Sequence, residues 1–203
     1  MIEVSQTVDW IKRTNEKLQT QKDYLTSLDR KIGDGDHGIN MARGFQEVAN
    51  ALGNEEFNEV SDVLKKTALT VMSKVGGASG PLYGTTFLKM STACKGKQVD
   101  RAAFADMVEA ALDGIKQRGK AQTGEKTMID VWSPVLAAMK ENPEWKVDEI
   151  KEVAHTAMEE TETMVATKGR AAYLKERSKG NLDPGSVSSY YLFEAFAEAV
   201  EGS

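Results

Sequence analysis

Apolar residues recur along most of this chain at the three- and four-residue spacing of amphipathic helices. In the first such stretch, residues 4–28, the apolar positions are Val8, Ile11, Leu18, Leu25 and Leu28. No stretch shows the alternation of apolar and polar residues that is typical of a strand. The pattern predicts helices over residues 4–28, 38–52, 60–75, 81–94, 101–117, 127–140, 147–167 and 186–200, with a short helical piece at 171–176.

Cap and proline residues agree with several of these boundaries. Asp100 suits the N-cap of the helix at 101–117, and Pro134 is expected to kink or end the helix at 127–140. Asp183 and Pro184 suit the cap and the first turn of the last helix. The 203 residues contain no evident linker, so we expect an all-α fold with one domain, 1–203, of about eight antiparallel helices.

Charge and composition exclude several classes of protein. The net charge of -5 argues against a nucleic-acid-binding face, which would need to be basic. No apolar run approaches the roughly 18 residues that a membrane span requires. The first residues, 1–12, lack the pattern of a signal peptide, and the single cysteine, Cys94, allows no intrachain disulfide. A cytoplasmic location is therefore expected.

Four connections between the predicted helices carry unusual chemistry, and two helices, or roughly two, separate each from the next. In an antiparallel bundle, alternate connections lie at the same end. The four are therefore expected to meet at one rim. They are residues 29–40, 76–84, 119–128 and 168–185.

The first of these connections is acidic. Asp29, Asp34 and Asp36 lie within eight residues, and glycines between them allow the backbone to fold back so that the carboxylates meet. A hard divalent cation such as Mg²⁺ would relieve their mutual repulsion. A simple Asp/Gly turn and a calcium loop are the alternatives, although the complete EF-hand pattern is absent. His37 follows directly and could donate a hydrogen bond to a phosphate beside such a metal.

The second connection is rich in small residues and precedes a helix. Free backbone N–H groups at a helix start, with the hydroxyl of Ser79, can hold a phosphate. The loop is neither a Walker loop nor a GxGxxG motif, and a purely structural glycine-rich turn is the alternative. In the fourth connection, Arg170 is suited to contact a phosphate with both arms of its guanidinium group. A surface ion pair is the alternative for Arg170.

Four blocks, in order over nearly the whole chain, resemble the nucleotide-binding domain of dihydroxyacetone kinases. Residues 33–41 (GDGDHGINM) are similar to the family's metal-binding signature, and residues 76–85 (GGASGPLYGT) to its phosphate loop. Residues 126–132 and the span 170–186 match its later blocks. The resemblance implies an all-helical, barrel-like bundle that holds a Mg-nucleotide at one rim.

The resemblance also implies roles for individual residues. Asp29, Asp34 and Asp36 would hold Mg²⁺, and Arg170 would contact the phosphates and act in phosphoryl transfer. Gly119 and Met128 would flank the base or ribose. Asp183, Pro184 and Gly185 would close over the nucleotide. The residues implied around the rest of the nucleotide are His37, Gly38, Ile39, Asn40, Ala78, Ser79 and Gly80.

The chain contains no substrate-binding domain, so it resembles the free-standing subunit of the phosphotransferase-system type. That resemblance implies tightly held ADP as a cofactor. A partner carrying a phosphohistidine would convert the ADP to ATP, and a second partner would present dihydroxyacetone to receive the phosphoryl group.

Three alternatives remain open. The nucleotide-binding domain of fatty-acid kinases is related, although a threonine is expected there in place of His37. The subunit could serve an ATP-dependent kinase for another small ketose or polyol, since the sugar would bind to the partner. It could also be a nucleotide-loaded regulator of a transcription factor.

Overall fold

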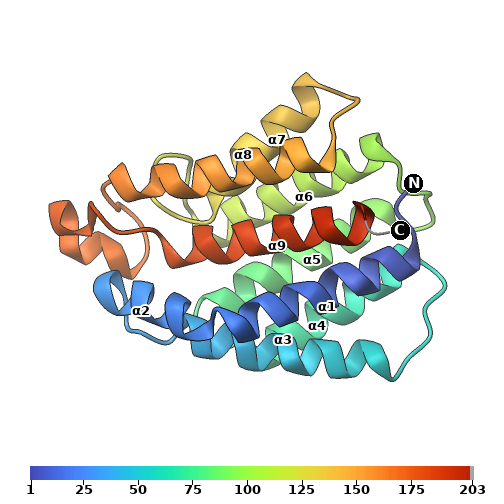
Figure 1. The fold of residues 1–203 in the computed structure, drawn as a ribbon, viewed down its shortest axis with the longest axis horizontal. Coiled ribbons are helices and arrows are strands. Elements are labelled where there is room, and N and C mark those ends of the chain that lie inside the picture. Colours follow the sequence, from blue (N-terminus) through green and yellow to red (C-terminus); the bar gives the residue numbers. More distant parts are fainter. Residues whose placement is uncertain (202–203) are drawn as a thin grey trace.

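The computed structural model describes residues 1–201, which form nine α-helices, two 3₁₀ segments and no β-strand (Figure 1). The helices are α1 (Val4–Thr20), α2 (Lys22–Ile32), α3 (His37–Gly53), α4 (Val60–Lys74), α5 (Ser79–Cys94), α6 (Arg101–Gly119), α7 (Ile129–Glu141), α8 (Val147–Glu160) and α9 (Pro184–Glu201). The 3₁₀ segments are η1 (Thr161–Thr163) and η2 (Arg170–Ser178). The expected all-α fold is confirmed.

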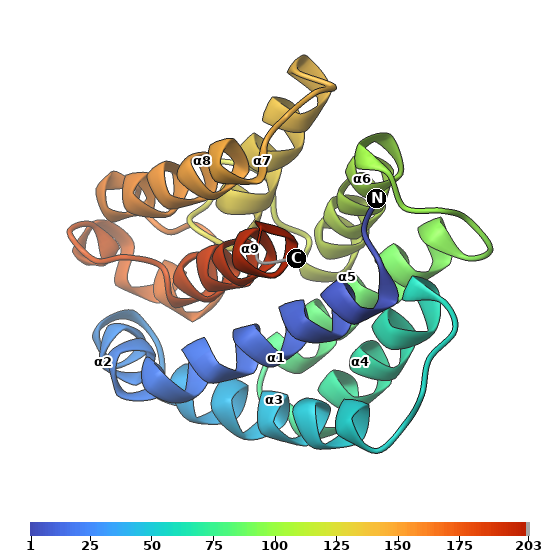
Figure 2. The ribbon, with the colours of Figure 1, turned by 45° about the vertical axis from the view of Figure 1, so that its right-hand side comes forward.

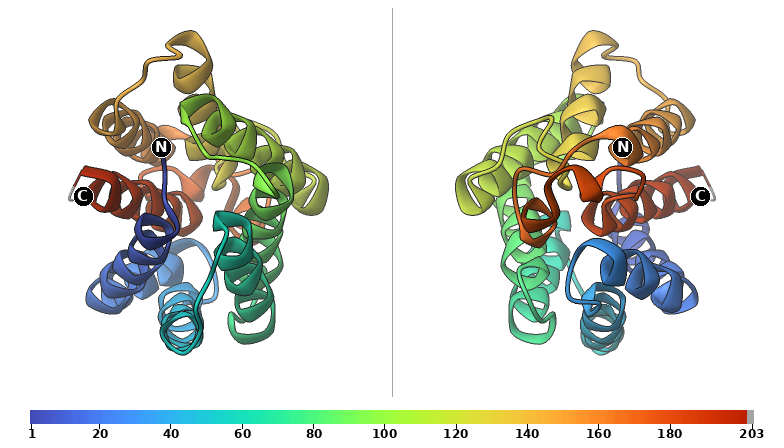
Figure 3. Two further views of the ribbon diagram at one scale, coloured as in Figure 1. Left: turned by 90° about the vertical axis from the view of Figure 1, so that its right-hand side faces the viewer. Right: turned by 90° about the vertical axis from the view of Figure 1, so that its left-hand side faces the viewer.

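Eight of the helices form a closed ring. Along the ring, α1 contacts α3, then α4, α5, α6, α7, α8 and α9 follow in order, and α9 contacts α1 again. The end-on views of Figure 3 show this barrel-like arrangement. Helix α2 stands outside the ring, at one end, against α3, α9 and η2.

Aromatic side chains fill the interior of the barrel. Trp10 of α1 lies edge-on to Phe87, Phe104 and Phe196, and the last two rings stack with centroids 4.2 Å apart. The buried indole N–H of Trp10 donates to the backbone carbonyl of Leu192 over 2.8 Å. This hydrogen bond offsets the free-energy cost of burying the indole N–H. It also joins α1 to α9 at the centre of the core.

Three of the predicted helices differ from the structure. The helix expected over 147–167 ends at Glu160 as α8, and the 3₁₀ segment η1 continues it only to Thr163. The single helix expected over 4–28 breaks at Gln21, where ψ is 9°, and resumes as α2, which reaches Ile32. Both halves keep the amphipathic spacing, so the pattern could not locate the break. Helix α7 continues through Pro134, which lies in its second turn and removes one backbone hydrogen bond. The predicted N-cap at Asp100 is confirmed, because its carboxylate accepts from the N–H of Ala103 over 2.8 Å.

Different elements lie at the two ends of the barrel. Figures 1 and 2 place α2, η2 and the starts of α3, α5 and α9 at one end, and the N-terminus with the end of α9 at the other.

No helix among residues 1–201 combines the length and apolar character needed to cross a lipid bilayer.

Candidate functional site

The first part of the site is the last turn of α2, which places the side chain of Asp29 next to the N-terminus of α3. One carboxylate oxygen of Asp29 accepts from the backbone N–H groups of Asp36, over 2.8 Å, and His37, over 3.1 Å. The side chain of Asp36, at the N-cap position of α3, makes no capping bond. Asp29, rather than Asp36, therefore caps α3, and the Asp36 carboxylate is not used for capping.

The three acidic side chains of the first loop meet. Oxygen atoms of Asp29, Asp34 and Asp36 all lie within 4.8 Å of one another. Partial burial raises the pKa of Asp36, and the neighbouring charges of Asp34 and Asp29 raise it further. Hard oxygen donors that repel one another at this spacing fit a divalent cation such as Mg²⁺, which would replace the repulsion with attraction.

The glycine–serine loop lies opposite these carboxylates. Gly77 has a φ of +66°, a conformation that a residue with a side chain rarely adopts, and a Cβ there would lie 3.8 Å from a carboxylate oxygen of Asp36. Helix α5 begins at Ser79, so its free N–H groups face the same region. The loop therefore sets the positive end of a helix next to the acidic cluster, an arrangement suited to a metal-bound phosphate.

A chain of hydrogen bonds runs from the partly buried Ser79 into the core. The Nδ1 of His37 lies 2.9 Å from the Ser79 hydroxyl, and its Nε2 lies 2.9 Å from the Ser188 hydroxyl. Ser188 in turn lies 2.6 Å from the hydroxyl of Tyr83. Tyr83 continues to Ser189, which accepts from the indole of Trp132. The network fixes the position of the Ser79 side chain from behind.

Burial decides the protonation state of this network. It lowers the pKa of His37 to about 4, so the imidazole is neutral near pH 7. Burial also raises the pKa of the Tyr83 hydroxyl, which stays protonated. A neutral His37 can donate from one nitrogen and accept at the other, which suits its position between two hydroxyl groups.

We expect His37 to make the nucleotide-free protein acid-sensitive. Its folded-state pKa of about 4 lies below the ordinary value of 6.5, so the unfolded chain takes up a proton first as the pH falls between these values. This contribution destabilises the fold by up to about 3 kcal/mol at pH 4, because one pKa unit corresponds to about 1.4 kcal/mol.

Asp183 acts in the opposite direction. Burial raises its pKa to about 6, so below that pH the folded state takes up a proton more readily than the unfolded chain and gains stability. The comparison with a His37→Gln variant isolates the histidine. Urea unfolding should show a stability difference between the two proteins that changes by about 3 kcal/mol from pH 7 to pH 4. A difference independent of pH would contradict the buried, neutral histidine.

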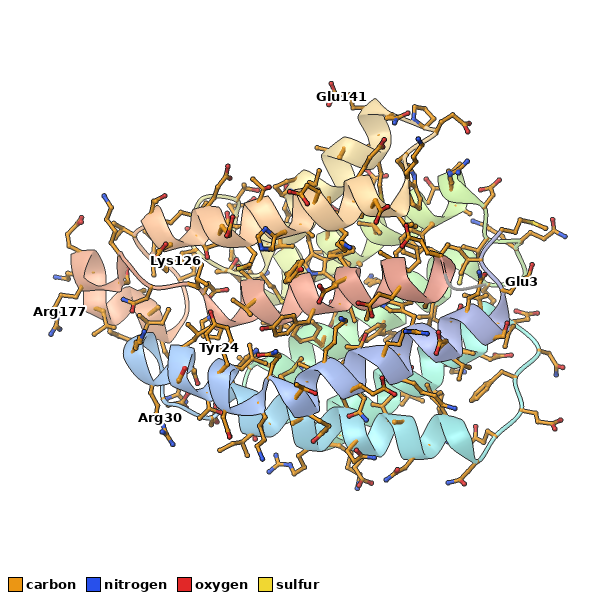
Figure 4. The ribbon with its side chains drawn as sticks, viewed as in Figure 1. Glu3, Tyr24, Arg30, Lys126, Glu141 and Arg177 are labelled. Carbon is orange, nitrogen blue, oxygen red and sulfur yellow. The ribbon has the colours of Figure 1, made fainter. Side chains whose placement is uncertain are left out.

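The far side of the site is formed by residues 164–185, which Lys126 holds in place. The ammonium group of Lys126 donates to the backbone carbonyls of Met164, over 3.1 Å, and Ser178, over 2.8 Å. The side chain is 1% exposed, and burial lowers its pKa. Figure 4 shows Lys126 at the same end of the molecule as η2. The buried Lys126 therefore binds the backbone on both sides of Arg170, at Met164 and at Ser178.

Two further residues of this segment, Arg170 and Asp183, are also anchored. Arg170 lies 2.9 Å from a carboxylate oxygen of Asp34, while 69% of its side chain remains exposed. Asp183 accepts from the backbone N–H of Ser186 over 2.7 Å, which confirms its predicted cap of α9. The Arg170–Asp34 pair closes the mouth of the site by a bridge that an incoming phosphate could replace.

These parts enclose a cleft of about 200 Å³ to which all four loops contribute. A larger groove, of about 660 Å³, lies at the other end of the barrel, lined in part by Trp145 and Phe196. Among residues 1–201, the only group of three acidic, histidine or cysteine side chains close enough to hold a metal ion is at the smaller cleft. Chemistry rather than size therefore marks the functional site.

Eleven of the residues singled out from the sequence line this cleft, and five do not. Those lining it are Asp29, Asp34, Asp36, His37, Ala78, Ser79, Met128, Arg170, Asp183, Pro184 and Gly185. Those outside its lining are Gly38, Ile39, Asn40, Gly80 and Gly119.

The five residues outside the lining have other surroundings. Gly38 and Gly80 allow close helix packing, since a Cβ would lie 2.1 Å from the Lys22 carbonyl or 2.3 Å from the Val75 carbonyl, respectively. Asn40 accepts from the guanidinium of Arg43 over 2.8 Å. Ile39 is 47% exposed. Gly119 lies beside Leu82, which does line the cleft.

Sequence reasoning missed several residues of the site. Lys126, Thr127, Leu82 and Tyr83 line the cleft, and Ser188 holds His37 from α9. The first four stand within the blocks of family resemblance at 76–85 and 126–132, which was the one available signal. Ser188 gave none, because it lies 151 residues from His37 along the chain.

Comparisons with known proteins find similar chains. The model of the DAK2 domain family matches residues 31–198. The chain is 47% identical to the ADP-binding subunit of the PTS-dependent dihydroxyacetone kinase of Lactococcus lactis, over 98% of this chain and 100% of that one. It is 40% identical to the ADP-binding subunit of the PEP-dependent dihydroxyacetone kinase of Escherichia coli, over 97% of each chain.

A solved structure shows the same fold. The dihydroxyacetone kinase of C. freundii superimposes with a TM-score of 0.76 at 25% identity over 95% of this chain. The match covers 34% of that kinase, so this chain spans about a third of its length.

Proposed function

The chain belongs to the DAK2 domain family, and on that premise we propose that it is the ADP-binding, phosphotransfer subunit of a phosphoenolpyruvate-dependent dihydroxyacetone kinase. Bound ADP acts as a cofactor that accepts a phosphoryl group from a phosphohistidine-carrying partner and, as ATP, passes it to dihydroxyacetone on another subunit. The observation that carries the proposal is the cluster of Asp29, Asp34 and Asp36 opposite the start of α5. We propose a cytoplasmic location for this work.

The residues of this chain bind and position rather than exchange protons with the sugar. The three carboxylates would hold Mg²⁺, which supplies charge neutralisation for the phosphates. Ser79 and the N–H groups at the start of α5 are placed to hold phosphate oxygens, with the neutral His37 fixing the hydroxyl. Met128 and Leu82 offer apolar surface to the rest of the nucleotide. Phosphoryl transfer depends mainly on such positioning and electrostatic stabilisation.

The direct test is to identify retained nucleotide. The protein is purified in Mg²⁺, desalted and examined by native mass spectrometry, with an EDTA-treated sample beside it. ADP that stays bound and is lost on chelation supports the cofactor role and the acidic metal site together. Failure to bind added Mg-ADP would overturn the proposal, and free exchange with ATP would favour an ordinary ATP-dependent subunit.

For Arg170 we expect a kinetic effect without a loss of binding. Arg170→Ala should retain ADP, because most of the cleft is unchanged, but should transfer phosphoryl groups about 100-fold more slowly, a typical cost of removing one transition-state donor. Arg170→Lys should recover part of the rate, since it keeps the charge but not the planar fork.

The matched control for this prediction is Arg118→Ala on the exposed end of α6. Single-turnover transfer measured on ADP-loaded protein checks the prediction. An unchanged rate in Arg170→Ala would remove Arg170 from the mechanism.

A further inference from the structure

Three polar residues lie on the side of α3 that faces the glycine–serine loop. They are Asp36, at the N-cap position, Asn40 and Arg43, and their spacing of four and three residues places them on one side of the helix. The backbone N–H of Asn40 donates to the Asp36 carbonyl over 2.9 Å. Asp36 lines the cleft, whereas Asn40 and Arg43 do not. The last two residues therefore lie next to the acidic cluster without reaching the space that a nucleotide would fill.

The hydrogen bond between Arg43 and Asn40 fixes the direction of the Asn40 amide. A guanidinium nitrogen of Arg43 donates to the Oδ1 of Asn40 over 2.8 Å. A guanidinium group carries donors and no acceptor, so only the oxygen of the amide can face Arg43 favourably. The NH₂ group of Asn40 is consequently directed away from Arg43.

The other end of the amide meets Asp36. The Nδ2 of Asn40 and a carboxylate oxygen of Asp36 both lie 3.8 Å from the position that a Cβ would take at Gly77. Burial and the charge of Asp34 raise the pKa of Asp36, whereas a hydrogen bond from the Asn40 side chain lowers it. An ionised carboxylate only accepts, so it requires the NH₂ group of the amide. Both neighbours of Asn40 therefore favour the same orientation, in which Arg43 donates to Asn40 and Asn40 donates to Asp36.

The glycine–serine loop packs directly on this pair. A Cβ at Gly76 would lie 2.7 Å from the Oδ1 of Asn40 and 3.1 Å from a guanidinium nitrogen of Arg43. Asn40 is 8% exposed, so its polar atoms depend on partners within the protein. Arg43 is exposed and has no carboxylate partner among residues 1–201. A surface ion pair therefore does not account for the direction of its side chain.

We propose that Arg43 is a positioning residue of the metal site, which orients Asn40 so that Asn40 holds the Asp36 carboxylate in place for the cation. The inference rests on the proposed function, because the role has meaning only if the acidic cluster binds Mg²⁺. Outer partners keep metal ligands in position, and losing one typically costs about 10- to 100-fold in metal affinity. Arg43 itself contacts neither the cation nor the nucleotide in this role.

The charge of Arg43 alone predicts the opposite effect. A positive charge near a metal site repels the metal ion, so removing it should strengthen metal binding when no nucleotide is present. Loss of a positioning residue should weaken that binding instead. The sign of the change in metal affinity therefore separates the two roles.

The test measures the binding of Mn²⁺ to the nucleotide-free protein by electron paramagnetic resonance. Mn²⁺ is the probe because, like Mg²⁺, it prefers carboxylate oxygens. Arg43→Ala should bind Mn²⁺ about tenfold more weakly than the wild type. Arg43→Lys should recover most of this loss, since its ammonium group can still donate to the Asn40 oxygen. The matched control is Arg101→Ala, which removes an exposed arginine at the other end of the barrel and should leave Mn²⁺ binding unchanged.

A double-mutant cycle tests whether Arg43 acts through Asn40. Asn40→Ala should weaken Mn²⁺ binding at least as much as Arg43→Ala. Adding Arg43→Ala to Asn40→Ala should cause no further loss, because no amide is left to orient. Losses that add in the double variant would overturn the action through Asn40.

Thermal unfolding of the metal-free proteins is measured beside the binding. The melting temperature of Arg43→Ala should equal that of the wild type, whereas a fall in parallel with the affinity would indicate a general loss of structure and overturn the positioning role. Mn²⁺ binding that is equal or tighter in Arg43→Ala would also overturn that role and leave the proposed function standing. Failure of the wild type to bind Mn²⁺, with or without ADP, would overturn the proposed function and this inference with it.

Discussion

Asp36→Asn should weaken the binding of Mg-ADP by about 100-fold or more, or about 2.7 kcal/mol, while leaving the fold intact. Loss of an outer-shell partner of a metal ligand already costs 10- to 100-fold, so loss of a direct ligand is expected at or beyond the upper limit. The fold should survive because Asp29, not Asp36, caps α3 through the N–H groups of Asp36 and His37.

The same substitution should not lower the stability of the nucleotide-free protein. The pKa of Asp36 is raised by burial and by the charges of Asp34 and Asp29, which means that its ionised form is disfavoured where it stands. An uncharged amide of the same shape removes that repulsion. Binding and stability are therefore expected to change in opposite directions, which a general loss of structure would not produce.

Isothermal titration with Mg-ADP and thermal unfolding without nucleotide measure the two effects. Asp106→Asn, at an exposed position on α6, is the matched control. Addition of EDTA should weaken nucleotide binding strongly in the wild type and little further in Asp36→Asn, because the variant has already lost the cation. Wild-type affinity in Asp36→Asn would remove the metal site from the cleft.

The arrangement of the site followed from connectivity more than from any single motif. The apolar spacing gave enough helices for alternate connections to be assigned to one end, and the loops at 29–40, 76–84, 119–128 and 168–185 do contribute to one cleft. What the spacing could not give was the break at Gln21, because residues on both sides keep the helical period. The helix end that positions Asp29 therefore lay beyond the predicted boundary.

Contacts between distant residues were beyond sequence reasoning for a different reason. His37 has a clear local setting beside the acidic loop, but its neutral state depends on burial against Ser188, which is far away along the chain. A serine in a helix is common and carries no signal of such a contact. The charged loops were enough to predict the chemistry of the site. The hydrogen-bond network behind His37 could not be predicted, because it depends on how the helices pack into the barrel.

Lys126 is the strongest case of such a hidden role, and Lys126→Met should loosen residues 164–178. Methionine keeps an apolar stem of similar length but cannot donate to the carbonyls of Met164 and Ser178. Hydrogen bonds from a charged donor contribute about 1.5–3 kcal/mol each, and carbonyls left without a partner add to the cost. The free energy of unfolding should fall by about 3 kcal/mol or more.

Lys126→Met should also weaken nucleotide binding, because the loosened segment lines the cleft. Residues 168–171 line the cleft, so a loosened segment must be ordered again when nucleotide binds, and the affinity for Mg-ADP should fall. Hydrogen–deuterium exchange should speed up in residues 164–180 and stay unchanged in α4 and α5. Lys65→Met, at an exposed position on α4, is the matched control and should alter neither property.

The backbone at Lys126 supports this interpretation. Its φ of 62° lies in the left-handed region, which costs a residue with a side chain about 1–2 kcal/mol and persists only where surrounding contacts maintain it. The two carbonyl bonds are the contacts that can do so, since they hold the ammonium group inside the fold. Unchanged exchange in residues 164–180 of Lys126→Met would show that the apolar packing of Ala166, Ala171 and Leu174 on Ile32 holds the segment by itself.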